Sequence, residues 1–211
     1  ASGFSALALC IVSIEKHTMK LSDEDFYKIA SFISRLGSGS ACRSIYGHLA
    51  LWGNHPSSKK SSDYFATPYN DAHNIFSDFQ DSILIVDKSK KKVSSSVGHN
   101  LMIDHPYAKT RFTQANSNMR VLTKALNEGD LSLFNQIVEK EALVLHAMMM
   151  TSTPSFILMK PNTLNIIEKI GKERDSSGLP LSFTLDAGAN VHLLYPSSYK
   201  TEVTSFIENE L

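Results

Sequence analysis

Residues 181–195 read LSFTLDAGANVHLLY, and this stretch indicates the fold class of the chain. Two short apolar runs, at 181–185 and 190–195, lie on either side of Asp186-Ala187-Gly188-Ala189. Short apolar runs separated by Asp and Gly are typical of β-strands joined by a tight turn. The stretch therefore predicts a hairpin that carries Asp186 on its turn.

The segments around this hairpin alternate between strand and helix patterns. Apolar runs at 82–86 and 156–159 predict two further strands. Helices are expected at about 106–126, then after a break at 127–130 up to the methionines at 148–150, then at about 162–174 and at the C-terminus. Strands and helices interleaved in this way predict an α+β sandwich with helices on one side of a sheet.

The first 70 residues have a different character. Helical spacing of Phe4, Leu7, Ile11 and Ile14 predicts a first helix that buries this face. A second helix is expected to begin at Ser22, an N-cap with an acidic residue three positions later, and to end at Gly37. The polar stretch 52–71 is expected to be an exposed loop that marks a domain border, which divides the chain into 1–70 and 71–211.

Composition restricts the class of protein. The 211 residues carry 21 Lys and Arg against 21 Asp and Glu, so no basic excess points to a nucleic acid or membrane-surface partner. No apolar run is long enough to predict a membrane-spanning helix. Two cysteines do not make a disulfide framework, and a reducing cytoplasm is the expected location.

One candidate ligand segment is GSGSACRS at residues 37–44. Its glycines permit close backbone approach, its hydroxyls can bind an anion, and Arg43 offers a fork of donors for a carboxylate or phosphate. The alternative is a helix break with a serine cap and a solvated arginine. The Lys-Ser/Thr ending of a P-loop is missing from this segment.

Two further segments could carry chemistry. Asp186 on a tight turn could point into a cleft, or it could cap its own backbone in an ordinary hairpin. The loop VSSSVG at residues 93–98 could bind phosphate oxygens or be a flexible connection, and the lysines at 88–92 are read as a solvated turn. The spacing of His99 and His105 does not match a zinc site, so no metal is predicted, and His146 is expected to pack in the core.

Together these segments resemble a known family. GSGSACRS, VSSSVG, His146-Ala147 and DAGAN at 186–190 occur in the order and approximate spacing of diphosphomevalonate decarboxylases, which belong to the GHMP kinase superfamily. The resemblance implies a GHMP-kinase-like two-domain architecture. Residues 1–70 would be the remnant of the N-terminal, ribosomal S5 domain 2-like domain, and 71–211 the ferredoxin-like C-terminal α/β sandwich.

The resemblance also implies an activity and a site. The activity is ATP-dependent decarboxylation of mevalonate 5-diphosphate to isopentenyl diphosphate, with Mg2+, in a cytoplasmic homodimer of the mevalonate pathway. Asp186 and Arg43 would be catalytic, and Ser38, Ser40, Arg43 and Ser95 would bind the substrate. The main ATP phosphate loop would lie before Ala1, which leaves open whether the chain alone is active.

Three positions depart from the family pattern and keep alternatives open. Leu185 replaces a Phe or Met, Ala189 replaces a proline, and His99 replaces a common methionine. A phosphomevalonate decarboxylase, a mevalonate 3-kinase-like homologue or a non-catalytic module of the same fold are the alternatives. Convergence of Asp186, Arg43 and Ser40 on one cleft is the expectation that separates an enzyme from a non-catalytic module.

Overall fold

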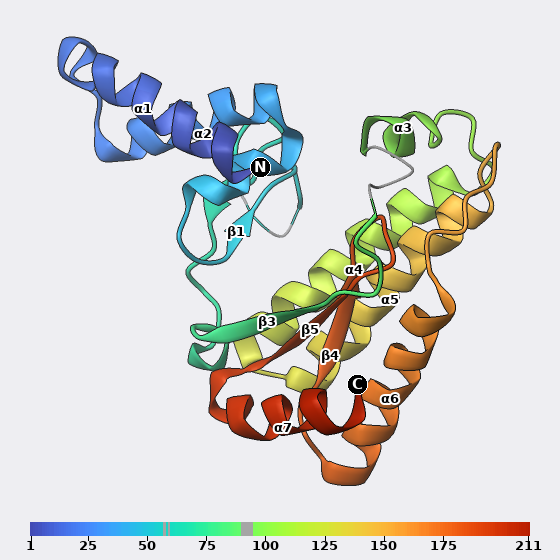
Figure 1. The fold of residues 1–211 in the computed structure, drawn as a ribbon. Coiled ribbons are helices and arrows are strands. Elements are labelled where there is room, and N and C mark those ends of the chain that lie inside the picture. The colour runs from blue at the N-terminus through green and yellow to red at the C-terminus, as the bar shows by residue number, and fades with distance from the viewer. Residues whose placement is uncertain (57, 59, 90–94) are drawn as a thin grey trace. The chain divides into compact units, whose positions relative to one another are not determined.

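The chain forms two compact units in a computed structural model, residues 1–71 and 72–211 (Figure 1). The structure describes residues 1–56, 58, 60–89 and 95–211, so the predicted lysine turn lies partly outside the described residues. Each unit has an apolar core of its own. Within the described residues, no helix is long and apolar enough to cross a membrane.

The first unit is mainly helical. Its elements are α1 (Ser2–Met19), α2 (Asp23–Gly37), the 3-10 helix η1 (Gly39–Ile45), and the short antiparallel strands β1 (Ala50–Leu51) and β2 (Thr67–Pro68). The predicted start of α2 is confirmed, because the Ser22 hydroxyl accepts a hydrogen bond from the Asp25 amide at 3.1 Å. The predicted end at Gly37 is also confirmed.

The predicted buried face of α1 is wrong. Phe4, Leu7, Ile11 and Ile14 are between 43% and 75% exposed, whereas Ser5, Ala8 and Val12 are buried. Small residues at positions 5 and 8 let the α1 backbone approach η1 closely enough for the Ser5 hydroxyl to donate to the Ala41 carbonyl at 2.8 Å. The helix therefore turns its small residues, rather than its large ones, toward the rest of this unit.

The stretch 52–71 is only partly the exposed loop that was predicted. Ala66 and Thr67 are buried, and Thr67 belongs to β2. The Ala66 amide donates to the buried Ser31 hydroxyl at 2.9 Å, which draws this part of the stretch onto α2. A buried backbone amide needs such a partner, so the contact accounts for the burial.

The second unit is an antiparallel sheet packed against helices. Its elements are η2 (Asn74–Phe76), β3 (Phe79–Leu84), α3 (Ser95–Asn100), α4 (Ala108–Glu128), α5 (Leu131–Met150), α6 (Pro161–Ser177), β4 (Ser182–Leu185), β5 (Val191–Pro196), η3 (Ser197–Tyr199) and α7 (Lys200–Glu210). The strand order is β3-β5-β4, and both pairings are antiparallel. The predicted α+β class is confirmed.

The helices cover one face of this sheet, as predicted. Along β5, Val191, Leu193 and Tyr195 are buried in the core, while His192 and Leu194 between them are only partly covered. Ile166 and Ile170 of α6 pack into the same core, and α5 runs beside β4 (Figure 1). The alternation follows the two-residue repeat of a strand.

The break between the two long helices is also confirmed. Gly129 has φ 74°, a conformation that glycine adopts without steric cost, and ends α4. Asp130 caps α5 by accepting the Leu133 amide at 2.9 Å.

The predicted strand at 156–159 is wrong, because these residues form no strand. The Ser152 hydroxyl donates to the carbonyls of Met149 and Pro154, and the Phe156 amide donates to the Met149 carbonyl at 2.9 Å. These bonds hold the segment against the end of α5 instead of an edge of the sheet. Ile157 is consequently 77% exposed.

Candidate functional site

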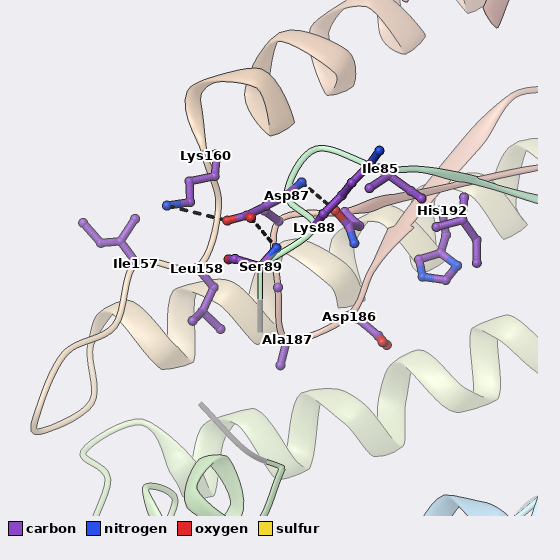
Figure 2. A pocket seen from close by; sticks show the side chains of 14 residues that line it. Ile85, Asp87, Lys88, Ser89, Ile157, Leu158, Lys160, Asp186, Ala187 and His192 are labelled. Atoms are coloured by element: carbon purple, nitrogen blue, oxygen red, sulfur yellow. Dashed lines mark hydrogen bonds and ion pairs between the residues drawn. The ribbon is translucent and has the colours of Figure 1, made fainter. Parts of the chain in front are cut away.

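The Asp186 turn follows β4 directly. Leu185 before it is buried, whereas Asp186 itself is exposed. The strand therefore ends in the core, and Asp186 lies at the surface. The turn borders a cavity of about 460 Å³ whose walls include Ile85, Lys88 and Lys160. Figure 2 shows Lys160 directed toward Asp87, with the Asp186 side chain pointing away from that pair.

Side chains from other elements hold this turn in place. The ring Nε2 of His146, on α5, lies 3.1 Å from the Asp186 carbonyl oxygen. The Thr163 hydroxyl, on α6, donates to the Ala189 carbonyl at 2.6 Å. The Asn190 side-chain oxygen accepts the amides of Val86 and Asp87, just after β3, at 2.9 and 3.0 Å. The turn is therefore tied to two helices and to the neighbouring strand.

His146 is buried, and its burial favours the neutral form of the imidazole. It is 1% exposed, so the prediction that it packs in the core is confirmed. Burial lowers the pKa of His146 below its ordinary value of about 6.5, and the hydrogen bond to the Asp186 carbonyl only partly opposes this. Because a carbonyl can only accept, Nε2 carries the proton of the neutral ring. The imidazole thus contributes a directed N–H beside Asp186 without adding a charge.

An apolar cavity of about 390 Å³ reaches the other side of the same turn, at Ala187. Most of its wall is apolar, and it also includes Arg111 and His99, the position at which the sequence departs from the family's usual methionine. Arg111 is paired with Glu141 rather than free, through two guanidinium hydrogen bonds to the carboxylate. The cavity therefore presents an apolar surface beside the turn.

The Glu141 carboxylate accepts three hydrogen bonds from side chains of α4. Burial alone would raise its pKa, but hydrogen bonds from Arg111 and Asn118 outweigh that effect and hold the pKa below its ordinary value. The Asn118 amide donates to the carboxylate at 2.6 Å. This cluster fixes α4 to α5 behind the apolar cavity.

The segment with Ser38, Ser40 and Arg43 belongs to the first unit. Ser38 ends α2 in an extended conformation, and Ser40 and Arg43 are exposed on η1. The Arg43 guanidinium lies 5.8 Å from the centre of the Trp52 ring, a distance at which a cation is attracted to the ring face. Arg43 is thus exposed to solvent with an aromatic side chain beside its guanidinium.

Buried serines hold this segment from behind. The Ser5 hydroxyl donates to the Ala41 carbonyl and the Ser31 hydroxyl to the Cys42 carbonyl, at 2.8 and 2.9 Å. Cys42 is fully buried, and burial raises the pKa of its thiol. The buried residues of η1 therefore face these partners while Ser40 and Arg43 face solvent.

The predicted site residues are divided between the two units. Ser38, Ser40 and Arg43 share one segment of the first unit, and Asp186 lies on its turn in the second. Ser95 is the first residue of α3, and its side chain lies outside the described part of the structure. Convergence of Arg43, Ser40 and Asp186 on one cleft stays a prediction.

Sequence reasoning missed the contacts that position Asp186. The Thr163 bond to Ala189 and the His146 bond to Asp186 were not anticipated, since the partners are 26 and 40 residues apart in the chain. Thr163 does carry a local signal, because it is the third residue of α6, where its hydroxyl also accepts the Lys160 amide at 3.1 Å. Such a threonine is recognisable as a capping residue, but its second partner is not.

The fold and the anchored aspartate turn define the chain as an α+β protein of the GHMP kinase class. Residues 82–211 match the family described as mevalonate 5-diphosphate decarboxylase C-terminal domain. Residues 1–64 match the diphosphomevalonate decarboxylase-like N-terminal domain. The chain therefore belongs to the mevalonate diphosphate decarboxylase family, and the predicted family resemblance is confirmed.

Individual relatives agree with this assignment. The chain is 27% identical to the diphosphomevalonate decarboxylases of Ganoderma lucidum and Saccharomyces cerevisiae, matching 98% of this chain and 52% and 51% of theirs. It is 24% identical to the phosphomevalonate decarboxylase of Haloferax volcanii, over 92% of this chain. The chain spans about half the length of the curated relatives it matches.

Solved structures show the same fold. Mevalonate diphosphate decarboxylase from Staphylococcus aureus superposes with a TM-score of 0.81 at 25% identity, covering all of this chain and 63% of that one. The structure described as MDDEF in complex with MVAPP, AMPPCP and magnesium gives a TM-score of 0.84 at 27% identity and covers 62% of that chain. The latter protein binds an ATP analogue and magnesium together with its small-molecule ligand.

Proposed function

We propose that this chain acts in the ATP-dependent decarboxylation of mevalonate 5-diphosphate to isopentenyl diphosphate, carbon dioxide, ADP and phosphate. The observation that carries the proposal is the exposed Asp186 on a turn that three other elements hold in place, in a chain that matches the family in both units. Preorganised groups of this kind are what a site needs in order to act on a transition state. We also propose 1–70 and 71–211 as the two domains, and a homodimer in the cytoplasm.

Asp186 would act on the tertiary hydroxyl of the substrate. As a carboxylate it would accept or orient the hydroxyl proton while ATP phosphorylates the oxygen. When the phosphate then departs, a positive charge develops on carbon, and a negative side chain nearby would stabilise it. Loss of carbon dioxide leaves its bonding electrons to form the new double bond.

Arg43 would hold the substrate carboxylate. Its planar fork of donors suits a carboxylate, and Trp52 beside it limits the orientations of the guanidinium. Ser38 and Ser40, on the same segment, would bind the substrate and its diphosphate, and Ser95 would lie near the reacting groups. These roles follow the family's motifs position by position.

ATP and magnesium would enter as a complex. Among the described residues, no group of three or more His, Cys, Asp or Glu side chains is placed to hold a metal ion. Magnesium bound to a nucleotide takes most of its ligands from phosphates and water, so such a protein cluster is not required. We therefore assign the ion to the nucleotide and no described residue to the ion.

A phosphomevalonate decarboxylase is the second candidate, because one such enzyme is among the relatives. The test measures phosphate and carbon dioxide release by the chain with ATP, magnesium and either the 5-diphosphate or the 5-phosphate. Equal release of both products from the diphosphate is the expected result. ADP without carbon dioxide would indicate a kinase, and no turnover with either substrate would contradict the proposed function for this chain.

A further inference from the structure

Two buried side chains of α5 bind the chain at the two ends of β4. Near the start of the helix, the Asn135 amide donates to the Leu181 carbonyl at 3.0 Å. Near its end, His146 Nε2 lies 3.1 Å from the Asp186 carbonyl. Asn135 and His146 are 6% and 1% exposed; the Asn135 bond is buried, and the His146 bond, which ends on the exposed residue Asp186, is partly buried.

The helix and the strand cover the same length between these contacts. The 11 residues from Asn135 to His146 advance about 16 Å along a helix at about 1.5 Å each. The five residues from Leu181 to Asp186 advance about 16 Å along a strand at about 3.3 Å each. The match lets both bonds form without bending either element, so that the His146 bond can hold Asp186 at one place along α5.

We propose that His146 is a positioning residue for Asp186, acting through the Asp186 carbonyl to set the direction of the carboxylate. The inference rests on the proposed function, since it assigns a purpose to the orientation of Asp186. It adds a residue that touches neither substrate nor nucleotide in the proposed reaction. The Cα–Cβ direction of a residue follows from its peptide planes, so a bond that holds the carbonyl also restricts the direction in which the side chain leaves the backbone.

Packing alone does not account for a histidine at this position. His146 is 1% exposed, and an aliphatic residue at such a buried position would avoid the cost of burying an imidazole. Among the described residues, the only hydrogen bond of the ring is the one to the Asp186 carbonyl. The buried polar group is therefore directed at a single backbone atom, the one next to the proposed catalytic carboxylate.

The fold should tolerate loss of this bond. The Asp186 carbonyl also accepts the Gly188 amide at 2.7 Å, so it keeps one partner when the imidazole is removed. The Leu181 carbonyl likewise accepts from Arg174 at 2.9 Å as well as from Asn135. Each carbonyl thus has a donor from α5 and a further donor from elsewhere, which makes Asn135 a matched control for His146.

Three variants test the proposal by their kinetics. His146→Leu should lower kcat by about 10- to 100-fold, the loss expected from a misplacement of about 1 Å, with little change in KM. His146→Gln retains an N–H at a similar distance from the backbone and should restore most of kcat. Asn135→Leu removes the matched bond and should lower stability while leaving kcat near the wild-type value. Equal loss of kcat in Asn135→Leu and His146→Leu would overturn the proposal.

A second measurement does not depend on turnover. Amide hydrogen exchange of Gly188, followed by NMR in the unmodified chain and the three variants, reports how firmly the turn is held. Exchange should be at least about tenfold faster in His146→Leu than in the wild type, His146→Gln or Asn135→Leu. Unchanged exchange in His146→Leu would overturn the positioning role. If the wild-type chain shows no turnover, the proposed function fails while the exchange result still decides this proposal.

Discussion

The 3-10 segment η1 in the first unit and the turn 186–190 in the second are held by the same device. In both, buried side chains donate hydrogen bonds to backbone carbonyls, and the residues proposed to act face outward. The donors differ, because Ser5 and Ser31 use hydroxyls, whereas the turn is held by the Thr163 hydroxyl and by the His146 imidazole. Hydroxyl donors do not titrate near neutral pH, but an imidazole does.

This difference separates the two segments by their sensitivity to conditions. The segment that carries Arg43 should keep its conformation across the physiological pH range, as far as its serine donors determine it. The turn that carries Asp186 includes one donor whose protonation state can change. Variants in the two segments can therefore separate effects on the reaction from effects on stability and from effects of protonation.

The largest expected effect is the loss of kcat when Asp186 on the turn is replaced. Asp186→Asn should lower kcat by about 10²- to 10⁴-fold with little change in KM, because the carboxylate is proposed to act in the transition state. Steady-state kinetics with mevalonate 5-diphosphate measure both constants. A loss of substrate binding as large as the loss of kcat would contradict the assigned role.

Arg43→Lys should change KM rather than kcat. An ammonium cannot make the bidentate contact, so KM should rise by about tenfold, as expected for losing one charged hydrogen bond. The same assay applies, with Lys140→Arg as a surface control on α5. Unchanged kinetics would remove the carboxylate-binding role from Arg43 and leave the first segment without its proposed function.

The next effect is on stability of the first segment. The Ser31 hydroxyl donates to the Cys42 carbonyl and accepts a hydrogen bond from the Ala66 amide, so Ser31→Ala removes a partner from two buried backbone groups. The cost should be about 1–3 kcal/mol. Trp52, the single tryptophan, lies in this unit and reports its urea unfolding by fluorescence. Ser40→Ala, at an exposed position, should leave the midpoint unchanged.

A smaller effect should appear on acidification. Burial lowers the folded-state pKa of His146, so the unfolded chain takes up the proton first as pH falls below about 6.5. The contribution to stability is complete above that pH and is lost below it, by at most about 1.4 kcal/mol per pH unit. Glu141, whose pKa is also lowered, acts in a separate window below about pH 4.3.

Urea midpoints at pH 7.5 and 5.5 measure this effect. Hydrogen exchange in the second unit should show a decrease in the free energy of unfolding between pH 7.5 and 5.5 in the wild type. The decrease should be smaller in His146→Gln. Trp52 fluorescence reports the urea unfolding of the first unit, whose stability should change little through protonation of His146. Equal pH dependence in wild type and His146→Gln would remove the proposed distinction between hydroxyl and imidazole anchors.

The smallest effect concerns the two thiols. Cys10 is exposed, whereas Cys42 is buried, its pKa is raised by burial, and its Sγ lies 3.0 Å from the Gly39 carbonyl. A thiol reagent should therefore modify one cysteine quickly, and Cys10→Ser should abolish that fast phase. Because the Ser31 bond ends on Cys42, Ser31→Ala should accelerate the slow phase. Two fast thiols in the wild type would contradict the buried anchoring of η1.

Local signals predicted the elements whose partners are near in sequence. The hairpin with Asp186, the Ser22 cap and the Gly129 break each depend on residues within a few positions. The buried face of α1 could not be chosen locally, because Phe4, Leu7 and Ile11 follow the same helical spacing as Ser5, Ala8 and Val12. The choice depended on how closely η1 approaches, which is a tertiary property.

The residues of the candidate site also differ in whether the local sequence predicts them. Asp186, Arg43 and the serines could be selected because they lie in short segments that resemble those of a known family. The donors that hold them could not, since His146 and Asp186 are 40 residues apart and Ser5 and Ala41 are 36 apart. The sequence next to a buried serine or histidine does not predict which carbonyl its side chain will bind.

The equal spans of α5 and β4 also limit how this region can change in evolution. An inserted residue in β4 would advance the strand by about 3.3 Å and reverse the faces of all following side chains, while the helix beside it stayed the same length. Insertions and deletions between positions 181 and 186 would therefore separate Asp186 from His146 even where each element still folded. Divergence here should proceed by substitution alone, with the numbers of residues in the two intervals inherited together.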